Sequence, residues 1–285
     1  MDFEEAKNNA LGLLLLFLAY TFGGIIVAYL YIAIPGLVGE VHVSIIATFV
    51  FTAILYGAIA ILRRVFKITS NAGVLIVALI GTVFIYYFAW VFHVVFMFFG
   101  HNPFTELGNF LSETILLVFR SPEPINDLIY FIRMLNEQGL EIGDNYYYGL
   151  LLGVFWVGEF LIIFAAPVIA AFMFDGIFLY SYNTWANPRH FPYTFLRFGP
   201  EERERISAGD TDVILYQPMA VSSDFSTIAL LYADGARTEY IAVYDASLGK
   251  KGSVNHSNPS RAIQLTPERI AELEQKLALK YKEDF

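Results

Sequence analysis

The sequence contains no cysteine. This absence excludes disulfide bonds, thiolate zinc sites, iron–sulfur clusters and cysteine nucleophiles. Charged residues are also scarce, at 16% of the 285 residues, and neither half of the chain carries a basic stripe. Proteins that bind nucleic acid need such a stripe to neutralise phosphates. We therefore expect no nucleic-acid partner.

The common motifs of catalytic sites are missing as well. The chain has no nucleotide-binding loop, no H-E-x-x-H and no G-x-S-x-G pattern. Its five histidines are not spaced as metal ligands. We expect no enzyme activity, no metal and no cofactor.

Hydrophobic residues make up 56% of the chain, with 27 Phe and 18 Tyr. This content is too high for an ordinary soluble domain, and aromatic rings suit lipid-facing helices and membrane interfaces. Four segments reach or exceed the ~20 apolar residues that a helix needs to cross the hydrocarbon core. These predicted spans are residues 11–34, 43–62, 72–99 and 147–179.

The first predicted span is expected to be retained in the protein. The N-terminal residues MDFEEAKNNA are acidic, whereas a secretory signal begins with positive charge. The adjacent Gly23 and Gly24 could kink this helix or admit a neighbouring one. The span is expected to end at Pro35 and to form an antiparallel hairpin with the second, because only a short loop separates them.

The distribution of Lys and Arg predicts the orientation. Arg63, Arg64 and Lys67 lie between the second and third spans, and four arginines follow the fourth, whereas the long third loop is acidic. Because loops rich in Lys and Arg stay in the cytoplasm, both termini are expected there. We expect an integral protein of a bacterial inner (plasma) membrane, with the lipid bilayer as a partner.

Residues 100–145 form a long loop between the third and fourth spans. The dipeptides Asn102-Pro103 and Ser121-Pro122 each match a helix start, so we predict outer amphipathic helices at about 103–119 and 122–137. Three arrangements are open. The pair could lie on the outer membrane surface, dip into the membrane and line a vestibule, or form two further spans.

Residues 187–285 have the composition of a small cytoplasmic α+β domain, so the membrane domain is assigned to residues 1–186. A short helix is expected after Gly199-Pro200, and Asp234-Gly235 predicts a hairpin turn. Three strands are predicted, at residues 212–217, 227–233 and 238–244, followed by a loop at 246–261.

A final helix is predicted after Thr266-Pro267. Its apolar residues recur at helical spacing and form one stripe, supported by the pair Glu272 and Lys276 at i,i+4. The stripe comprises Ile270, Leu273, Leu277 and Tyr281.

Glu159 is the main candidate for a functional residue. A carboxylate at membrane depth costs roughly 2.5 to 3.5 kcal/mol, so it normally has a partner or a function. His93 is expected at a similar depth, which makes a His–Glu pair feasible, and Trp156 lies one turn from Glu159 and could shield it. Pro167 could free the carbonyl of Ile163 and create a polar spot nearby. Glu159 is interpreted either as a structural hydrogen-bonding group or as a proton or cation site.

Gly149 and Gly153 form a G-x-x-x-G pattern at the start of the fourth span. Such a pair lets another helix approach closely. That helix could belong to the same chain or to a second copy in an oligomer.

These features predict a mainly α integral membrane protein with four transmembrane helices, an outer amphipathic helical pair and a small C-terminal α+β domain. The expected function is that of a non-enzymatic accessory, sensor or effector subunit, which forms a homo-oligomer and binds a cytoplasmic protein partner. The alternative is a small ion or proton channel or transporter that uses Glu159.

Overall fold

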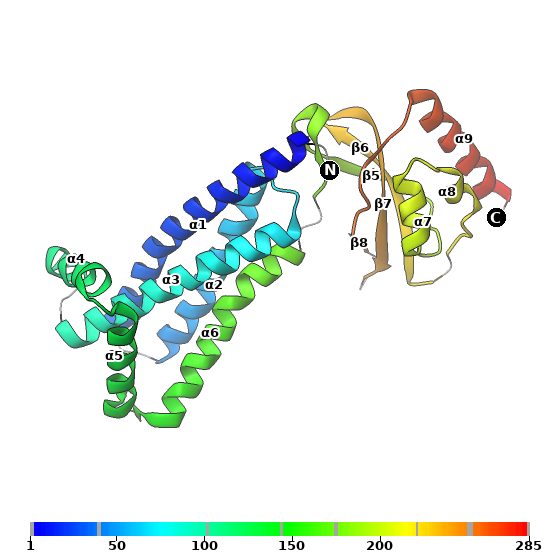
Figure 1. The fold of residues 1–285 in the computed structure, drawn as a ribbon. Helices are drawn as coiled ribbons and strands as arrows, with labels where there is room; N and C mark the ends of the chain where they lie inside the picture. Colours follow the sequence, from blue (N-terminus) through cyan, green and yellow to red (C-terminus); the bar gives the residue numbers. More distant parts are fainter. Residues whose placement is uncertain are drawn as a thin grey trace. The chain divides into compact units, whose positions relative to one another are not determined.

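The computed structural model describes residues 3–38, 41–100, 103–142, 145–173, 176–220, 222–249 and 253–283. The chain divides into two compact units, Met1–Phe174 and Asp175–Phe285. The first is a bundle of helices, and the second contains an antiparallel sheet with three helices (Figure 1). The division falls between 174 and 175, whereas the sequence placed the domain boundary at 186/187.

Four helices of the first unit are long and apolar enough to cross a membrane. This finding suits a multi-pass membrane protein and matches the four predicted spans. The helices are α1 (Phe3–Val38), α2 (Val41–Val65), α3 (Asn71–Phe99) and α6 (Gly149–Phe172). Helix α1 continues through Pro35 to Val38 rather than ending at the proline.

The predicted end of the fourth span, at residue 179, is wrong. Helix α6 ends at Phe172, and β3 (Phe178–Leu179) pairs with β4 (Thr184–Trp185) in a hairpin. The rings of Phe178 and Trp185 meet edge to face at 5.2 Å. Because apolar and aromatic residues suit a packed strand as well as a spanning helix, composition alone does not show where the helix stops.

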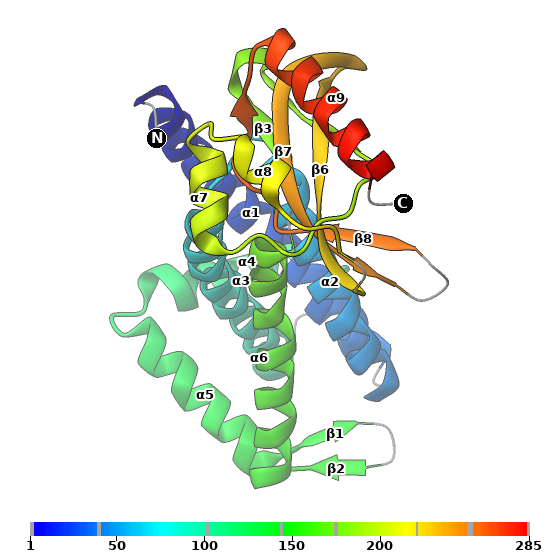
Figure 2. The ribbon, with the colours of Figure 1, turned by 90° about the vertical axis from the view of Figure 1, so that its right-hand side faces the viewer.

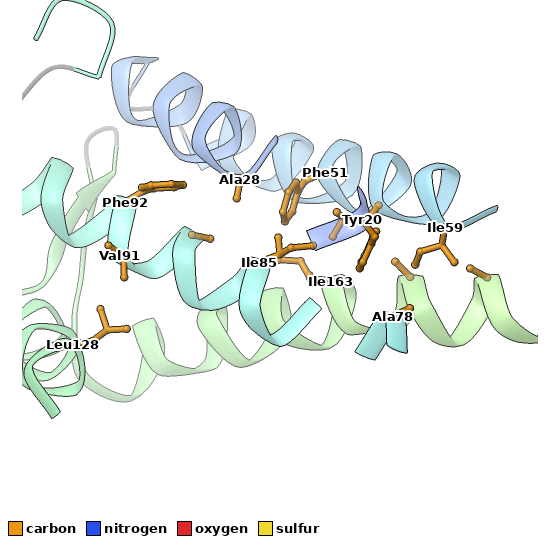
Figure 3. Packing of buried hydrophobic residues seen from close by; sticks show 14 of the residues in the cluster. Tyr20, Ala28, Phe51, Ile59, Ala78, Ile85, Val91, Phe92, Leu128 and Ile163 are labelled. Atoms are coloured by element: carbon orange, nitrogen blue, oxygen red, sulfur yellow. The ribbon is translucent and has the colours of Figure 1, made fainter. Parts of the chain in front are cut away.

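The bundle core lies between α1, α2, α3 and α6. Helix α1 packs against α2 and α3, and α6 packs against α2 and α3. Figure 3 shows Tyr20, Ile59, Ala78 and Ile163 directed into the space between these helices, and all four are buried. Many large apolar side chains on the outer faces, such as Phe22, are exposed, as lipid-facing helices require.

Small residues allow α1 and α3 to approach closely. A Cβ atom added at Gly24 would overlap Ile85 of α3, and one added at Gly81 would lie 2.7 Å from the ring of Tyr20. Gly24 therefore admits its neighbour as predicted, whereas Gly23 faces open space. The hydroxyls of Tyr20 and Thr82 form a hydrogen bond of 2.7 Å across the same contact.

The loop after α3 contains α4 (Leu107–Ile115), a π-helical turn (Leu116–Arg120) and α5 (Pro124–Gln138). Both helices begin later than predicted, and Asn102, one of the predicted helix starts, lies outside the described residues. With nine and fifteen residues, α4 and α5 are too short to span a bilayer. The arrangement with two further spans is therefore wrong for the described part of this loop.

Helices α4 and α5 pack against α3 at one end of the bundle, called here the α4–α5 end (Figures 1 and 2). Their buried residues Phe110, Leu128 and Leu135 join the bundle core, together with Leu117 of the π-helical turn. Strands β1 (Leu140–Ile142) and β2 (Asn145–Tyr147) then form a hairpin that the sequence did not predict.

The second unit is built on a five-stranded antiparallel sheet in the order β5-β6-β7-β8, with β9 also paired to β7. The strands are β5 (Asn187–His190), β6 (Asp224–Ala233), β7 (Ala236–Leu248), β8 (Val254–Ser257) and β9 (Ile263–Gln264). Asp234 and Gly235 connect β6 to β7 with φ values of 49° and 81°. Positive φ at both residues is typical of a tight hairpin turn, so the predicted hairpin is confirmed.

Two predictions for this unit are wrong. Residues 212–217 were expected to form a strand, but Asp212–Tyr216 is a short helix, α8. Its Val213 and Ile214 are buried, and its Asp212 forms an ion pair with Arg269 at 2.7 Å. The predicted loop at 246–261 instead contains the end of β7 and all of β8. Residues 250–252 of that loop lie outside the described residues. Backbone pairing with β7 forms β8 although Val254 is its only β-branched residue and Asn255 and Ser257 are not typical of strands.

Helices α7 (Pro200–Ser207), α8 and α9 (Pro267–Glu283) cover one face of the sheet (Figure 2). The predicted stripe of α9 is confirmed, because Ile270, Leu273 and Leu277 are buried in the core beneath these helices. The predicted pair also forms, with Glu272 and Lys276 at 2.5 Å. The other face of the sheet holds a second, smaller core that includes Leu179 of β3.

Candidate functional site

A cavity of about 550 Å³ lies in the helical bundle. Its wall is formed by the last turns of α1 and α3 and the first turns of α2 and α6, with Tyr147 of β2. The cavity therefore lies toward the α4–α5 end. Most of the wall is apolar, and the polar groups that line it are Tyr31, Ser44, Thr48, Trp90, His93, Tyr147, Trp156 and Glu159.

Glu159 projects from α6 into this cavity. Its carboxyl group accepts a hydrogen bond from the hydroxyl of Tyr31 on α1. The Tyr31 hydroxyl also lies 3.1 Å from the hydroxyl of Thr48, which donates to the carbonyl of Ser44 at 3.0 Å. The ring of Tyr31 is stacked on Phe51 at 4.5 Å, which holds the hydroxyl in place. Three helices thus position one carboxyl group.

His93 of α3 lines the same cavity, so the structure brings His93, Trp156 and Glu159 together. The Nε2 atom of His93 is buried and has no hydrogen-bond partner among the described residues. The carboxyl group is bonded to Tyr31 instead. Trp90 lies edge to face with both His93, at 5.6 Å, and Trp156, at 4.9 Å. The rings of Trp90 and Trp156 therefore shield the unpaired Nε2 atom of His93 from bulk water.

The other predicted site residues lie elsewhere. Pro167 is buried in α6 and does not line the cavity. A Cβ atom added at Gly149 or Gly153 would meet nothing within 4 Å, so no helix of the described chain packs there, and the intramolecular interpretation of this pair is wrong. Gly149 instead has φ +59° where α6 begins, a conformation that suits glycine. A contact with a second copy stays a prediction.

Several residues of the cavity were not predicted from the sequence. Tyr31, Thr48 and Trp90 are polar residues of candidate spans, and each could have been noted as a candidate on that ground. Gly158 was also missed. It lines the cavity, and a Cβ atom there would meet open space, so the absence of a side chain leaves room beside Glu159.

Arg63 forms a second polar cluster, at the opposite end of the bundle. It is only 2% exposed, although the sequence treated it as a loop charge. Its guanidinium donates to the carbonyls of Ile68 at 3.0 Å, Thr69 at 3.3 Å and Ala171 at 3.3 Å, and also to the side chain of Asn71. Ala171 lies in the last turn of α6, where the carbonyls carry the negative end of the helix dipole. Arg63 thus joins the α2–α3 turn to the end of α6.

A pair of histidines lies on the sheet of the second unit. The rings of His190 and His256 are stacked at 3.5 Å, and the hydroxyl of Thr227 lies 3.1 and 3.2 Å from their Nδ1 atoms. Burial, together with the neighbouring His256, lowers the pKa of His190 to about 4, and burial also lowers the pKa of His256. Both rings are therefore neutral at pH 7. No group of three or more His, Asp or Glu residues that could hold a metal occurs in the described part of the chain.

Comparison with known protein families, curated proteins and solved structures found no match to this chain. The site is therefore interpreted from its own chemistry. A half-buried carboxyl group, an unpaired imidazole nitrogen and several aromatic rings meet in a mostly apolar cavity. Such a cavity can bind an amphipathic molecule, because its wall accepts apolar groups and its few polar atoms fix their orientation.

Proposed function

We propose that this protein is a non-enzymatic membrane sensor subunit, whose bundle binds a small amphipathic molecule beside Glu159. The cavity is the observation that carries the proposal. Its volume of about 550 Å³ falls in the range of small-molecule sites, roughly 300 to 1,000 Å³, and its polar groups converge from four helices. In this proposal the C-terminal unit binds a protein partner, since that unit has a core of its own.

The packing beyond the cavity favours binding over transport. Toward the end of the bundle that contains Arg63, the interior is filled by buried apolar or aromatic residues, including Tyr20, Leu55, Ile59 and Ile163. A transport path needs polar or hydrated access on both sides of the site. A channel or transporter that uses Glu159 is the second candidate, because the carboxyl group does face a cavity in a candidate span.

Flux measurements on Glu159→Gln separate the two candidates. For a binding protein we expect wild-type liposomes to pass no more protons or cations than empty ones, and Glu159→Gln to change nothing. A transporter would instead show a flux that Glu159→Gln abolishes, because an amide cannot exchange a proton. Glu137→Gln is the matched control, since Glu137 is an exposed residue of α5 outside the cavity. A wild-type flux lost only in Glu159→Gln would replace our proposal with the second candidate.

We also propose that both termini lie in the cytoplasm of a bacterium and that the α4–α5 end faces outward, on the basis of the Lys and Arg distribution. Because the chain has no cysteine, labelling of a single cysteine introduced at Asn126 or Ser207 shows on which side of the membrane that residue lies. Both positions are exposed. In intact cells an impermeant thiol reagent is expected to label Asn126→Cys and not Ser207→Cys, and the reverse labelling would overturn the orientation.

The proposed homo-oligomer uses the face of α6 that carries Gly153. No side chain of the described chain fills the space beside this glycine, and the neighbouring Leu150 and Val157 are exposed. A second copy could approach there, because a glycine lets helix backbones come close in a membrane.

A further inference from the structure

We infer that the ligand of the cavity is a lipophilic protonated amine, a single ammonium group on an apolar tail. The inference rests on the proposed binding function and names its ligand class. Three features of the cavity wall carry it: the charge, the aromatic rings and the exposed apolar rim.

The first feature is charge. Glu159 is the one acidic residue of the described cavity wall, and that wall contains no Lys or Arg. The groups around the carboxyl, Tyr31, Thr48 and Ser44, are neutral. A carboxylate that leaves bulk water without a countercharge loses hydration free energy, and a cationic ligand supplies that countercharge. A ligand with negative charge would be repelled.

The second feature is the aromatic lining. Trp90 and Trp156 line the cavity at a centroid distance of 4.9 Å and an interplanar angle of 88°. Cations are attracted to the face of an aromatic ring, most strongly to that of tryptophan. The carboxylate of Glu159 lines the same cavity and can accept N–H bonds, and a protonated primary amine has three N–H donors. An amine therefore fits the cavity better than an ammonium group without N–H.

The third feature is the rim between α2 and α6. Four apolar residues of the cavity wall are also exposed on the outer surface: Ile45 by 45%, Phe49 by 57%, Val154 by 60% and Phe155 by 44%. The cavity thus reaches the surface between two candidate spans. Since that surface suits lipid, an apolar tail can enter sideways from the bilayer.

The test uses the full chain in phosphatidylcholine nanodiscs, with a ligand-dependent change in tryptophan fluorescence as the signal and empty nanodiscs as background. Trp90 and Trp156 line the cavity, whereas Trp185 lies in the second unit. The probes are dodecylamine, dodecyltrimethylammonium, dodecanol and dodecanoate. We expect dodecylamine to bind saturably at pH 7 and at least about tenfold more tightly than the other three probes. Glu159→Gln should weaken dodecylamine about tenfold or more, because a charge-assisted hydrogen bond is lost, and leave dodecanol unchanged.

A steric pair of variants checks the place of binding. Gly158 and Gly153 both lie on α6 with open space at Cβ, but only Gly158 lines the cavity. Gly158→Leu is expected to abolish dodecylamine binding, and Gly153→Leu to preserve it. Equal binding of dodecanol and dodecylamine, unchanged by Glu159→Gln, would overturn the ligand class and leave the binding function standing. Absence of binding by all four probes, or equal effects of the two glycine variants, would overturn the binding function itself.

Discussion

Leu273→Asp is expected to unfold the C-terminal unit. Leu273 is only 2% exposed and lies in the core between α9 and the sheet, with Ile270 and Leu277 on the same stripe. Truncation of a buried leucine costs about 2 to 5 kcal/mol, and an unpaired carboxylate in the same place adds its desolvation cost. A unit of this size has a total stability of about 5 to 15 kcal/mol, so the sum leaves little or no folded population.

The measurement is circular dichroism and limited proteolysis of residues 176–285. The fragment has to include β5 (Asn187–His190) and Phe195, because both belong to the sheet or its core. Leu279→Asp is the matched control, since Leu279 is 54% exposed on the same helix. We expect the control to stay folded and protease-resistant. A Leu273→Asp fragment as stable as the control would show that α9 does not pack on the sheet.

Arg63→Met is expected to destabilise the bundle by about 3 kcal/mol or more. The carbonyls of Ile68, Thr69 and Ala171 each lose a donor, and a buried acceptor without a partner costs about 1 to 3 kcal/mol. Arg63→Lys should recover only part of the loss, because a single ammonium group lacks the planar fork that reaches several carbonyls. Unfolding in detergent micelles, followed by tryptophan fluorescence, measures the difference.

Arg64→Met is the control for this experiment. Arg64 is the next residue of α2, and its side chain is exposed. Both variants remove one positive charge from the last turn of α2, so any effect on membrane orientation should be shared. Only the Arg63 variant removes the buried hydrogen bonds. Equal stability of the two variants would contradict the role assigned to Arg63.

Features that depend on neighbouring residues could be predicted from the sequence. The turn at Asp234-Gly235 follows from two residues that tolerate positive φ. The buried stripe of α9 follows from helical spacing, and the four long helices follow from runs of apolar residues. Features that depend on distant partners were missed. Strand β8 exists because β7 pairs with its backbone, and α8 is held by Arg269 of another helix.

The candidate site shows the same division. The sequence could single out Glu159, because a carboxyl group in an apolar helix stands out by its cost. It could not name Tyr31 as the hydrogen-bond partner, since that contact depends on which faces of α1 and α6 meet. The sequence made a pair with His93 feasible, and the structure leaves the Nε2 atom of His93 unpaired in the same cavity.

The sequence by itself determined that four apolar helices precede a small α+β unit. The length of an apolar run and the backbone preference of a segment depend only on residues that are close in the sequence. The tertiary structure alone decided that a cavity opens beside Glu159, that Arg63 is buried and that Gly153 faces outward. These outcomes depend on how each helix is rotated about its axis. That rotation is set by the packing of side chains from distant parts of the chain, such as Ile85 against Gly24.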